Sequence, residues 1–203
     1  MAAVLKQGGL FDEPEVDVQA PSIAGLHYIA DFIDTETEAT LIKVIDTQPW
    51  LTDLKRRVQH YGYRYDYKFR GLASDLYLGP IPEWLQPFCQ KLQSEGYFSQ
   101  TPDQVIVNEY LPGQGIASHT DCIPCFGDTI ASISLGSGCQ MDFVGGEAII
   151  SHYLEPQSLL VLSGEVRYHW KHGIAARKSD KIDGAAMPRA RRISLTFRNV
   201  ILN

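Results

Sequence analysis

The chain has 203 residues, enough for one well-buried domain and too few for several independent ones. Hydrophobic residues make up 44% and charged residues 21%, which excludes a disordered or collagen-like chain. The formal charge of -6 argues against a nucleic-acid partner, but fifteen of the eighteen cations lie in residues 53–70 and 165–198, so the sequence still allows a local basic surface.

Residues 1–22 are acidic, contain Pro14 and Pro21, and show no hydrophobic period, which predicts a flexible lead. The chain shows neither a secretory signal nor an apolar run near the roughly twenty residues that cross a bilayer. We therefore expect an intracellular, cytoplasmic monomer with no membrane contact, with the nucleus as an alternative location. Residues 23–203 are predicted to form a single domain, with helices and a lid over 23–100 and a β core over 101–203.

Two helices are predicted in the first half of the chain. The Asp34 carboxylate can cap free amides at the start of a helix that ends before Pro49. The apolar face of this helix would consist of Leu41, Ile42 and Ile45. A second helix is predicted over residues 82–95.

Residues 55–70 interleave six cations with four tyrosines. The tyrosines alternate, so a hairpin would place them on one face, where they could stack an extruded base while the cations neutralise phosphates. In the alternative interpretation, the tyrosines pack on the core. We favour a nucleic-acid interface, whose substrate contacts would be Arg56, Arg57, Tyr63 and Tyr65.

From residue 104 onward the pattern changes to short strands separated by turn residues. Seven are predicted, over residues 104–110, 129–135, 139–143, 147–153, 158–162, 168–174 and 192–200. No crossover helices separate them, which favours a mainly β sandwich or jelly roll with flanking helices over a parallel α/β sheet.

A candidate metal site lies in this β half. His119 and Asp121 are two residues apart, which places both side chains on one face of an extended segment. With His172 they would form the two-histidine, one-carboxylate set of non-haem Fe(II) oxygenases. His169 competes with His172, and strand alternation does not decide between them. The alternative interpretation makes His119 and Asp121 turn residues and His172 a structural strand histidine.

The strand over residues 192–198 suggests an anion clamp. Alternation sends Arg192, Ser194, Thr196 and Arg198 to one side. Guanidinium groups suit a small dianion because their planar fork grips carboxylates, and Asn108 and Tyr110 could add neutral donors. A solvated strand face is the alternative interpretation.

Four segments together resemble one family in the correct order. NEYLPGQGIASHTD, ISLGS with MDF, LLVLSGEVRYHWKHGI and RRISLTFR resemble the AlkB family of Fe(II)- and 2-oxoglutarate-dependent dioxygenases. Within that family the sequence is similar to the bacterial repair enzymes and to the oxygenase domain of the tRNA wobble-uridine hydroxylase. The resemblance spans about residues 25 to 200 and implies a double-stranded β-helix.

The resemblance also implies roles for individual residues. His119, Asp121 and His172 would hold Fe(II), because the family's distal histidine precedes Gly-Ile. Arg192, assisted by Tyr110, would bind the distal carboxylate of 2-oxoglutarate. The end of 2-oxoglutarate that chelates iron, where O2 also reacts, would lie near Arg198 and Asn108. Ser194 replaces a longer amide donor of the founding enzyme, which predicts a weaker or water-mediated distal contact, and Ile123 replaces its base-reading carboxylate.

The implied activity is oxidative dealkylation of N-alkylated nucleobases in DNA or RNA. One alternative is hydroxylation of a modified wobble uridine in tRNA, and another is a non-catalytic β module that binds nucleic acid. Cys122 and Cys125 would suit a redox motif, but no βαβ unit surrounds them, or a zinc site, but two further ligands are missing. They are therefore interpreted as loop thiols close to the iron that are prone to oxidation.

Overall fold

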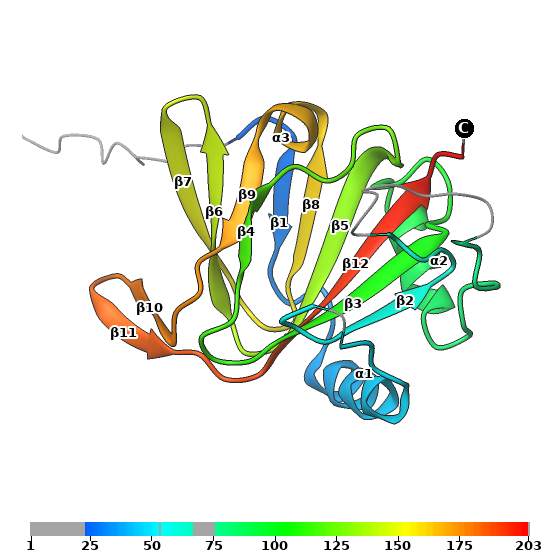
Figure 1. The fold of residues 1–203 in the computed structure, drawn as a ribbon, viewed down its shortest axis with the longest axis horizontal. Helices are drawn as coiled ribbons and strands as arrows, with labels where there is room; N and C mark the ends of the chain where they lie inside the picture. Colours follow the sequence, from blue (N-terminus) through cyan, green and yellow to red (C-terminus); the bar gives the residue numbers. More distant parts are fainter. Residues whose placement is uncertain (1–22, 53, 67–75, 203) are drawn as a thin grey trace, which may run out of the picture.

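The computed structural model describes residues 23–52, 54–66 and 76–202, so the predicted lead over residues 1–22 lies outside the described residues. Two antiparallel sheets face each other (Figure 1). The larger sheet contains, in spatial order, β1 (Leu26–Ile29), β8 (Leu159–Ser163), β5 (Phe126–Gly136), β12 (Arg192–Val200), β3 (Gln104–Tyr110) and β2 (Val58–Tyr61). The smaller sheet contains β4 (Ile116–His119), β9 (Lys171–Ile174), β6 (Cys139–Gly145) and β7 (Ala148–Leu154). The predicted mainly β jelly-roll fold is confirmed.

The central strand β12 explains how the two faces of the larger sheet differ. Ile193, Leu195 and Phe197 are buried in one apolar cluster with residues of the flanking helices. The intervening residues face a cavity between the two sheets and include both arginines of the strand. One face of this sheet therefore provides a core, and the other provides a site.

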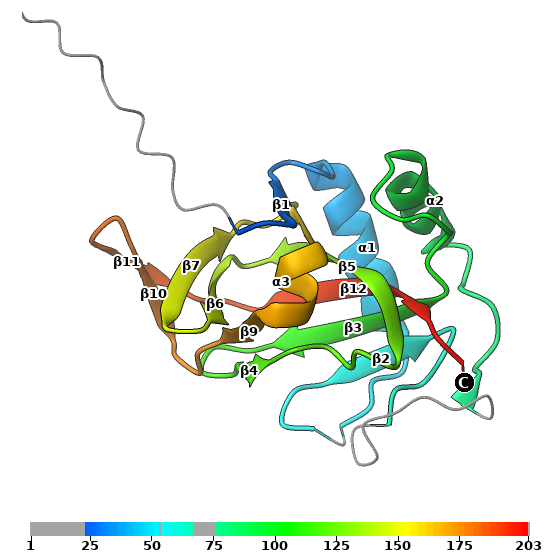
Figure 2. The same ribbon diagram turned by 90° about the horizontal axis from the view of Figure 1, so that it is seen from above.

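The helices α1 (Thr35–Thr47) and α2 (Gln86–Ser94) cover the side of the larger sheet away from the smaller one (Figure 2). The Asp34 carboxylate accepts a hydrogen bond from the Thr37 amide, which confirms the predicted cap of α1. The second helix begins at Gln86, later than the predicted residue 82, because Pro82 to Leu85 form a turn. No helix among the described residues has both the length and the apolar character needed to cross a membrane.

One predicted strand is only partly right. Residues 168–174 divide between the helix α3 (Gly164–His169) and the strand β9. Gly164 has a positive φ of 50°, which ends the extended backbone of β8 and starts the short helix. His169 therefore lies on a helix and not on the strand that carries His172. A separate hairpin is formed by β10 (Ser179–Ile182) and β11 (Ala185–Pro188).

Candidate active site

The structure brings together the three predicted iron ligands on the smaller sheet. His119, the last residue of β4, pairs across the sheet with His172 of β9. Asp121 follows just beyond the end of β4, with one carboxylate oxygen 3.8 Å from Nε2 of His119. One ligand atom from each residue lies within 4.8 Å of the others. His169 lies outside this cluster and is exposed on α3.

The protonation states of these groups suit a divalent cation. Nδ1 of His119 donates to the Ala117 carbonyl oxygen at 2.8 Å, which orients the ring so that Nε2 lies on the side of Asp121. Burial lowers the pKa of His172 to about 4, so this imidazole is neutral at pH 7. Burial alone would raise the pKa of Asp121, but the Arg198 guanidinium beside it holds this pKa below its usual range.

Asp121 also has an unused ligand atom. Arg198 donates to its Oδ1 at 3.2 Å, while its Oδ2 is buried with no hydrogen-bond partner. A buried carboxylate oxygen without a partner costs free energy unless a cation binds it. Two imidazoles and this oxygen therefore fit Fe(II), with coordination positions left open for other ligands.

The shifted pKa of His172 predicts a pH-dependent stability of the metal-free protein. An unfolded histidine binds a proton below about pH 6.5, whereas folded His172 stays neutral down to about pH 4. Stability should therefore fall on acidification through this window, by about 2 kcal/mol between pH 7 and pH 5. Urea unfolding of metal-free wild type and His172→Ala should show the excess loss in wild type only. Equal pH profiles would contradict the burial of a neutral His172.

A cavity of about 690 Å³ continues from the candidate ligands between the two sheets. Its lining includes all the residues predicted to contact 2-oxoglutarate, namely Asn108, Tyr110, Arg192, Ser194 and Arg198. The side chain of Arg198 lies at the metal end, beside Asp121. Arg192 lies at the other end of the β12 segment, with its guanidinium 5.6 Å from the centre of the Tyr110 ring.

The surroundings of the Arg192 guanidinium suit the binding of an anion. It is only 3% exposed, its Nη2 donates to the Ser134 hydroxyl at 2.9 Å, and its Nε has no partner. A buried guanidinium with an unused donor and no carboxylate beside it in the described part of the chain fits an external carboxylate. With Arg198 at the metal end, the cavity fits a dicarboxylate such as 2-oxoglutarate.

The two smaller polar residues of the predicted clamp already have protein partners. Ser194 and Ser132 lie 2.7 Å apart through their hydroxyl oxygens. The Asn108 side-chain oxygen accepts from Nε of Arg56 at 2.9 Å. The roles predicted for Ser194 and Asn108 with 2-oxoglutarate stay predictions.

The four residues predicted to contact the substrate lie in different places. Arg56 and Tyr65 line the cavity, and the Tyr65 ring lies 5.7 Å from the ring of Phe126. Tyr63 packs on Tyr77, outside the cavity lining.

The prediction that the tyrosines share one face is wrong for the described ones, because each packs against a different part of the protein. Tyr61 contacts the helix-side core, Tyr63 contacts Tyr77, and Tyr65 contacts the cluster between the sheets. Tyr67 lies outside the described residues.

Arg57 has a structural partner, Glu109, which the sequence analysis missed. Glu109 is 2% exposed on β3 and accepts two hydrogen bonds from Arg57, at 2.6 and 2.7 Å, and one from Arg191. Hydrogen bonds from Arg57, then those from Arg191, lower the pKa of Glu109 despite its burial. The sequence feature that could have identified Glu109 is its position between Asn108 and Tyr110. Alternation along the strand turns this acidic side chain away from the cavity.

Arg57→Ala should therefore act mainly on stability. Glu109 would lose two charged hydrogen bonds but keep Arg191, and Arg57 is partly exposed, so we expect a loss of about 1 kcal/mol. Urea unfolding measures this loss. The predicted phosphate contact of Arg57 would instead appear as a flatter salt dependence of nucleic-acid binding with unchanged stability.

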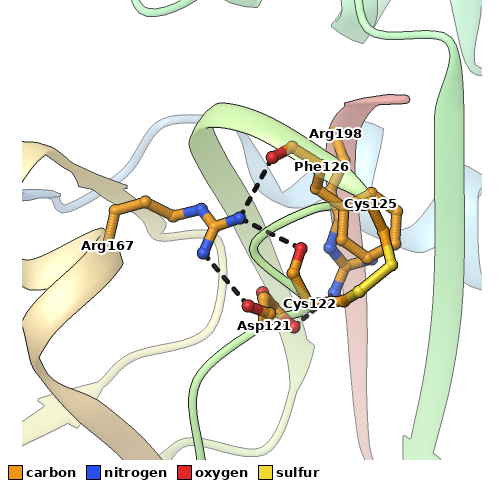
Figure 3. Close-up of a disulfide and its surroundings, with 6 residues drawn as sticks. All are labelled: Asp121, Cys122, Cys125, Phe126, Arg167 and Arg198. Atoms are coloured by element: carbon orange, nitrogen blue, oxygen red, sulfur yellow. Dashed lines mark hydrogen bonds and ion pairs between the residues drawn. A yellow bond between two sulfur atoms is a disulfide. The ribbon is translucent and has the colours of Figure 1, made fainter. Parts of the chain in front are cut away.

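A second residue that the sequence analysis missed is Arg167 of α3, which is 2% exposed. Its guanidinium donates to the carbonyl oxygens of Asp121, Cys122 and Phe126 at 3.2 to 3.4 Å (Figure 3). The same turn contains a disulfide between Cys122 and Cys125. The interpretation of these cysteines as free thiols is wrong, because the turn holds their Cα atoms 5.2 Å apart, within disulfide range.

Comparisons with known proteins agree with this site. The family model described as the 2OG-Fe(II) oxygenase superfamily matches residues 25–198, and the chain belongs to this superfamily. A solved structure titled OsALKBH1 covers 86% of this chain and 96% of its own, with a TM-score of 0.64 and 19% identity, which shows the shared fold. Within the superfamily the chain is similar to proteins that are named as AlkB homologues.

Two relatives illustrate how much of each protein is shared. The uncharacterized protein L905 of Acanthamoeba polyphaga mimivirus is 38% identical over 90% of this chain and 88% of its own length. The alkylated DNA repair protein ALKBH8 homolog of Arabidopsis thaliana is 35% identical over 88% of this chain. The match spans 59% of the Arabidopsis protein, so the chain corresponds to only part of that relative.

Proposed function

We propose that this chain oxidatively removes alkyl groups from nitrogen atoms of nucleobases in DNA or RNA, using Fe(II), 2-oxoglutarate and O2. The observation that carries the proposal is the continuity of one cavity, which joins the candidate iron ligands, the Arg192 and Arg198 anion sites, and the side chains of Arg56 and Tyr65. The name of the Arabidopsis relative, which refers to alkylated DNA repair, supports a nucleic-acid substrate.

Different residues of the chain would bind the iron and the 2-oxoglutarate. His119, Asp121 and His172 would hold Fe(II), and Arg192 and Arg198 would bind the two ends of 2-oxoglutarate. When bound, the iron and its co-substrates supply the oxidation of a substrate C–H bond, with release of succinate and carbon dioxide. Apolar side chains would restrict water in the same cavity, among them Ile130, Met141, Leu160 and Leu162.

Part of the cavity lining suits a base attached to a phosphate backbone. Tyr65 presents an aromatic ring to the cavity, while Arg56 and Lys171 add positive charge to its lining. Aromatic rings stack on bases of any sequence, and cations bind the flanking phosphates. Ile123, 47% exposed and two residues after Asp121, has an aliphatic side chain that offers no hydrogen bond to a base edge.

Mass spectrometry of products tests the proposal. Methylated single-stranded DNA, duplex DNA and total tRNA would each be incubated with the enzyme, Fe(II), ascorbate and 2-oxoglutarate. We expect formaldehyde and the loss of one CH₂ unit per methyl group. A gain of one oxygen atom on tRNA alone would replace the proposal with wobble-uridine hydroxylation. Binding without any 2-oxoglutarate turnover would indicate a non-catalytic module.

Tyr65→Ala should raise the KM for the nucleic-acid substrate about ten-fold, because a stacked base contributes about 1–3 kcal/mol. The matched control is Tyr63→Ala, which removes the same ring outside the cavity lining. Steady-state kinetics at saturating 2-oxoglutarate separate the two variants. Equal KM values for both would remove Tyr65 from the substrate site.

A further inference from the structure

The disulfide next to the candidate iron ligand has no role in the proposed reaction. Cys122 directly follows Asp121 in the chain and is bonded to Cys125 (Figure 3). Cys122 also lines the cavity that contains the three candidate ligands. The other two cysteines, Cys89 and Cys139, are buried and free. The four cysteines of the chain therefore form one disulfide, and this disulfide lies beside the candidate metal site.

The turn that contains the disulfide is fixed to the protein from α3. Arg167 donates to the Asp121 carbonyl oxygen at 3.2 Å, to that of Cys122 at 3.4 Å and to that of Phe126 at 3.2 Å. Within the turn, the amides of Cys125 and Phe126 both donate to the Cys122 carbonyl oxygen. The backbone from Asp121 to Phe126 is therefore one ordered unit.

The same unit is held from β12. The Arg198 guanidinium donates to Oδ1 of Asp121 and lies 4.7 Å from the centre of the Phe126 ring. Just beyond β12, the Ile201 amide donates to the Cys125 carbonyl oxygen at 2.9 Å. A change in the conformation of the turn therefore reaches the Asp121 carboxylate both through the chain and through Arg198.

The two sulfur-bearing residues differ in access. Cys125 is 4% exposed, whereas Cys122 is partly exposed and borders the cavity. A small thiol reagent that enters the cavity would therefore meet Cys122 first. Attack on the sulfur of Cys122 would be the first step of reduction of this disulfide.

We propose that Cys122 and Cys125 form a redox switch for the iron site, in which the disulfide holds Asp121 in position to coordinate and reduction weakens metal binding. This inference rests on the proposed iron site. The cross-link closes the turn immediately after Asp121, so its loss lets the backbone on that side of the ligand relax. Arg167 and Arg198 would still hold the turn, so we expect metal affinity to fall by about ten-fold, as for the loss of a supporting partner.

The switch needs a dithiol as reductant and a peroxide as oxidant. In reduction, one thiol of the dithiol attacks the sulfur of Cys122, the S–S bond breaks, and Cys125 leaves and takes up a proton. The second thiol then attacks the mixed disulfide, which releases reduced Cys122 and a cyclic disulfide. In oxidation, hydrogen peroxide converts one cysteine thiol to a sulfenic acid with loss of water. The other thiol displaces a second water molecule to restore the S–S bond.

Metal titration of the two redox states tests the proposal. The oxidised protein, and protein treated with a dithiol and then freed of it under anaerobic conditions, would be titrated with Fe(II) in the presence of 2-oxoglutarate. Alkylation and mass spectrometry of the intact chain would count the free thiols in each sample. We expect two additional thiols and about ten-fold weaker Fe(II) binding after reduction.

Two variants serve as controls. Cys122→Ser combined with Cys125→Ser should bind Fe(II) as weakly as the reduced wild type, with or without dithiol. Cys89→Ala removes a buried thiol on α2 and should keep the response to dithiol. Equal affinity in the two wild-type states, or a pair that the dithiol does not reduce in the folded protein, would overturn the switch and leave the iron site intact. Absence of Fe(II) binding in both states would overturn the iron site itself.

Discussion

His172→Ala should reduce Fe(II) affinity and turnover by more than about 100-fold. Loss of a residue that only supports a metal ligand already costs about 10- to 100-fold, and His172 is a candidate ligand itself. Its imidazole is neutral at pH 7, because burial lowers its pKa to about 4, so no proton has to leave before metal binds. Anaerobic Fe(II) titration and succinate release would measure the two effects.

The matched control is His169→Ala, three residues earlier in the chain. His169 is exposed on α3 and outside the cluster of candidate ligands, so this variant should keep wild-type affinity and turnover. A loss confined to His169→Ala would mean that the wrong histidine has been assigned to the metal. Circular dichroism of both variants would show that the fold is retained.

Arg192→Leu should raise the KM for 2-oxoglutarate by at least about 30-fold. Removal of one partner of a buried charge pair costs about 2–5 kcal/mol, and about 2 kcal/mol corresponds to that factor. The buried guanidinium has an unpartnered Nε and no carboxylate beside it among the described residues, so a bound dicarboxylate would be its main charged partner. Succinate formation as a function of 2-oxoglutarate concentration would measure the effect.

Arg191→Leu is the matched comparison, because it removes the guanidinium of the residue just before β12, which bonds outside the cavity. Arg191 donates to Asp46 and Glu109, outside the cavity lining. We expect lower stability and an unchanged KM for 2-oxoglutarate. If Arg191→Leu raised this KM as much as Arg192→Leu, the effect would come from general disturbance of β12.

The sequence predicted those features that depend on local periodicity and chemistry. Alternation along β12 correctly separated Ile193, Leu195 and Phe197 from the polar residues that face the cavity. The cap at Asp34 was predictable because a helix start needs a nearby acceptor. The spacing of His119 and Asp121 gave two members of the metal cluster without knowledge of the fold.

Other features depend on contacts between distant segments, which periodicity does not reveal. Arg167 reaches the turn after Asp121 only because α3 and that turn come together in three dimensions. Alternation alone left His169 and His172 open. The family resemblance favoured His172, and the pairing of β4 with β9 places it opposite His119. The Cys122–Cys125 bond depended on the geometry of the turn, which composition and compartment could not supply.

Anaerobic titration with Fe(II) and 2-oxoglutarate tests the central claim most directly. If His119, Asp121 and His172 hold one Fe(II) that 2-oxoglutarate also chelates, the protein should bind one iron per chain and develop a weak visible charge-transfer band. His119→Ala should lose both the stoichiometric binding and the band while it keeps its fold. A wild-type protein without the band, or a His119→Ala variant that retains it, would contradict the assignment of this site.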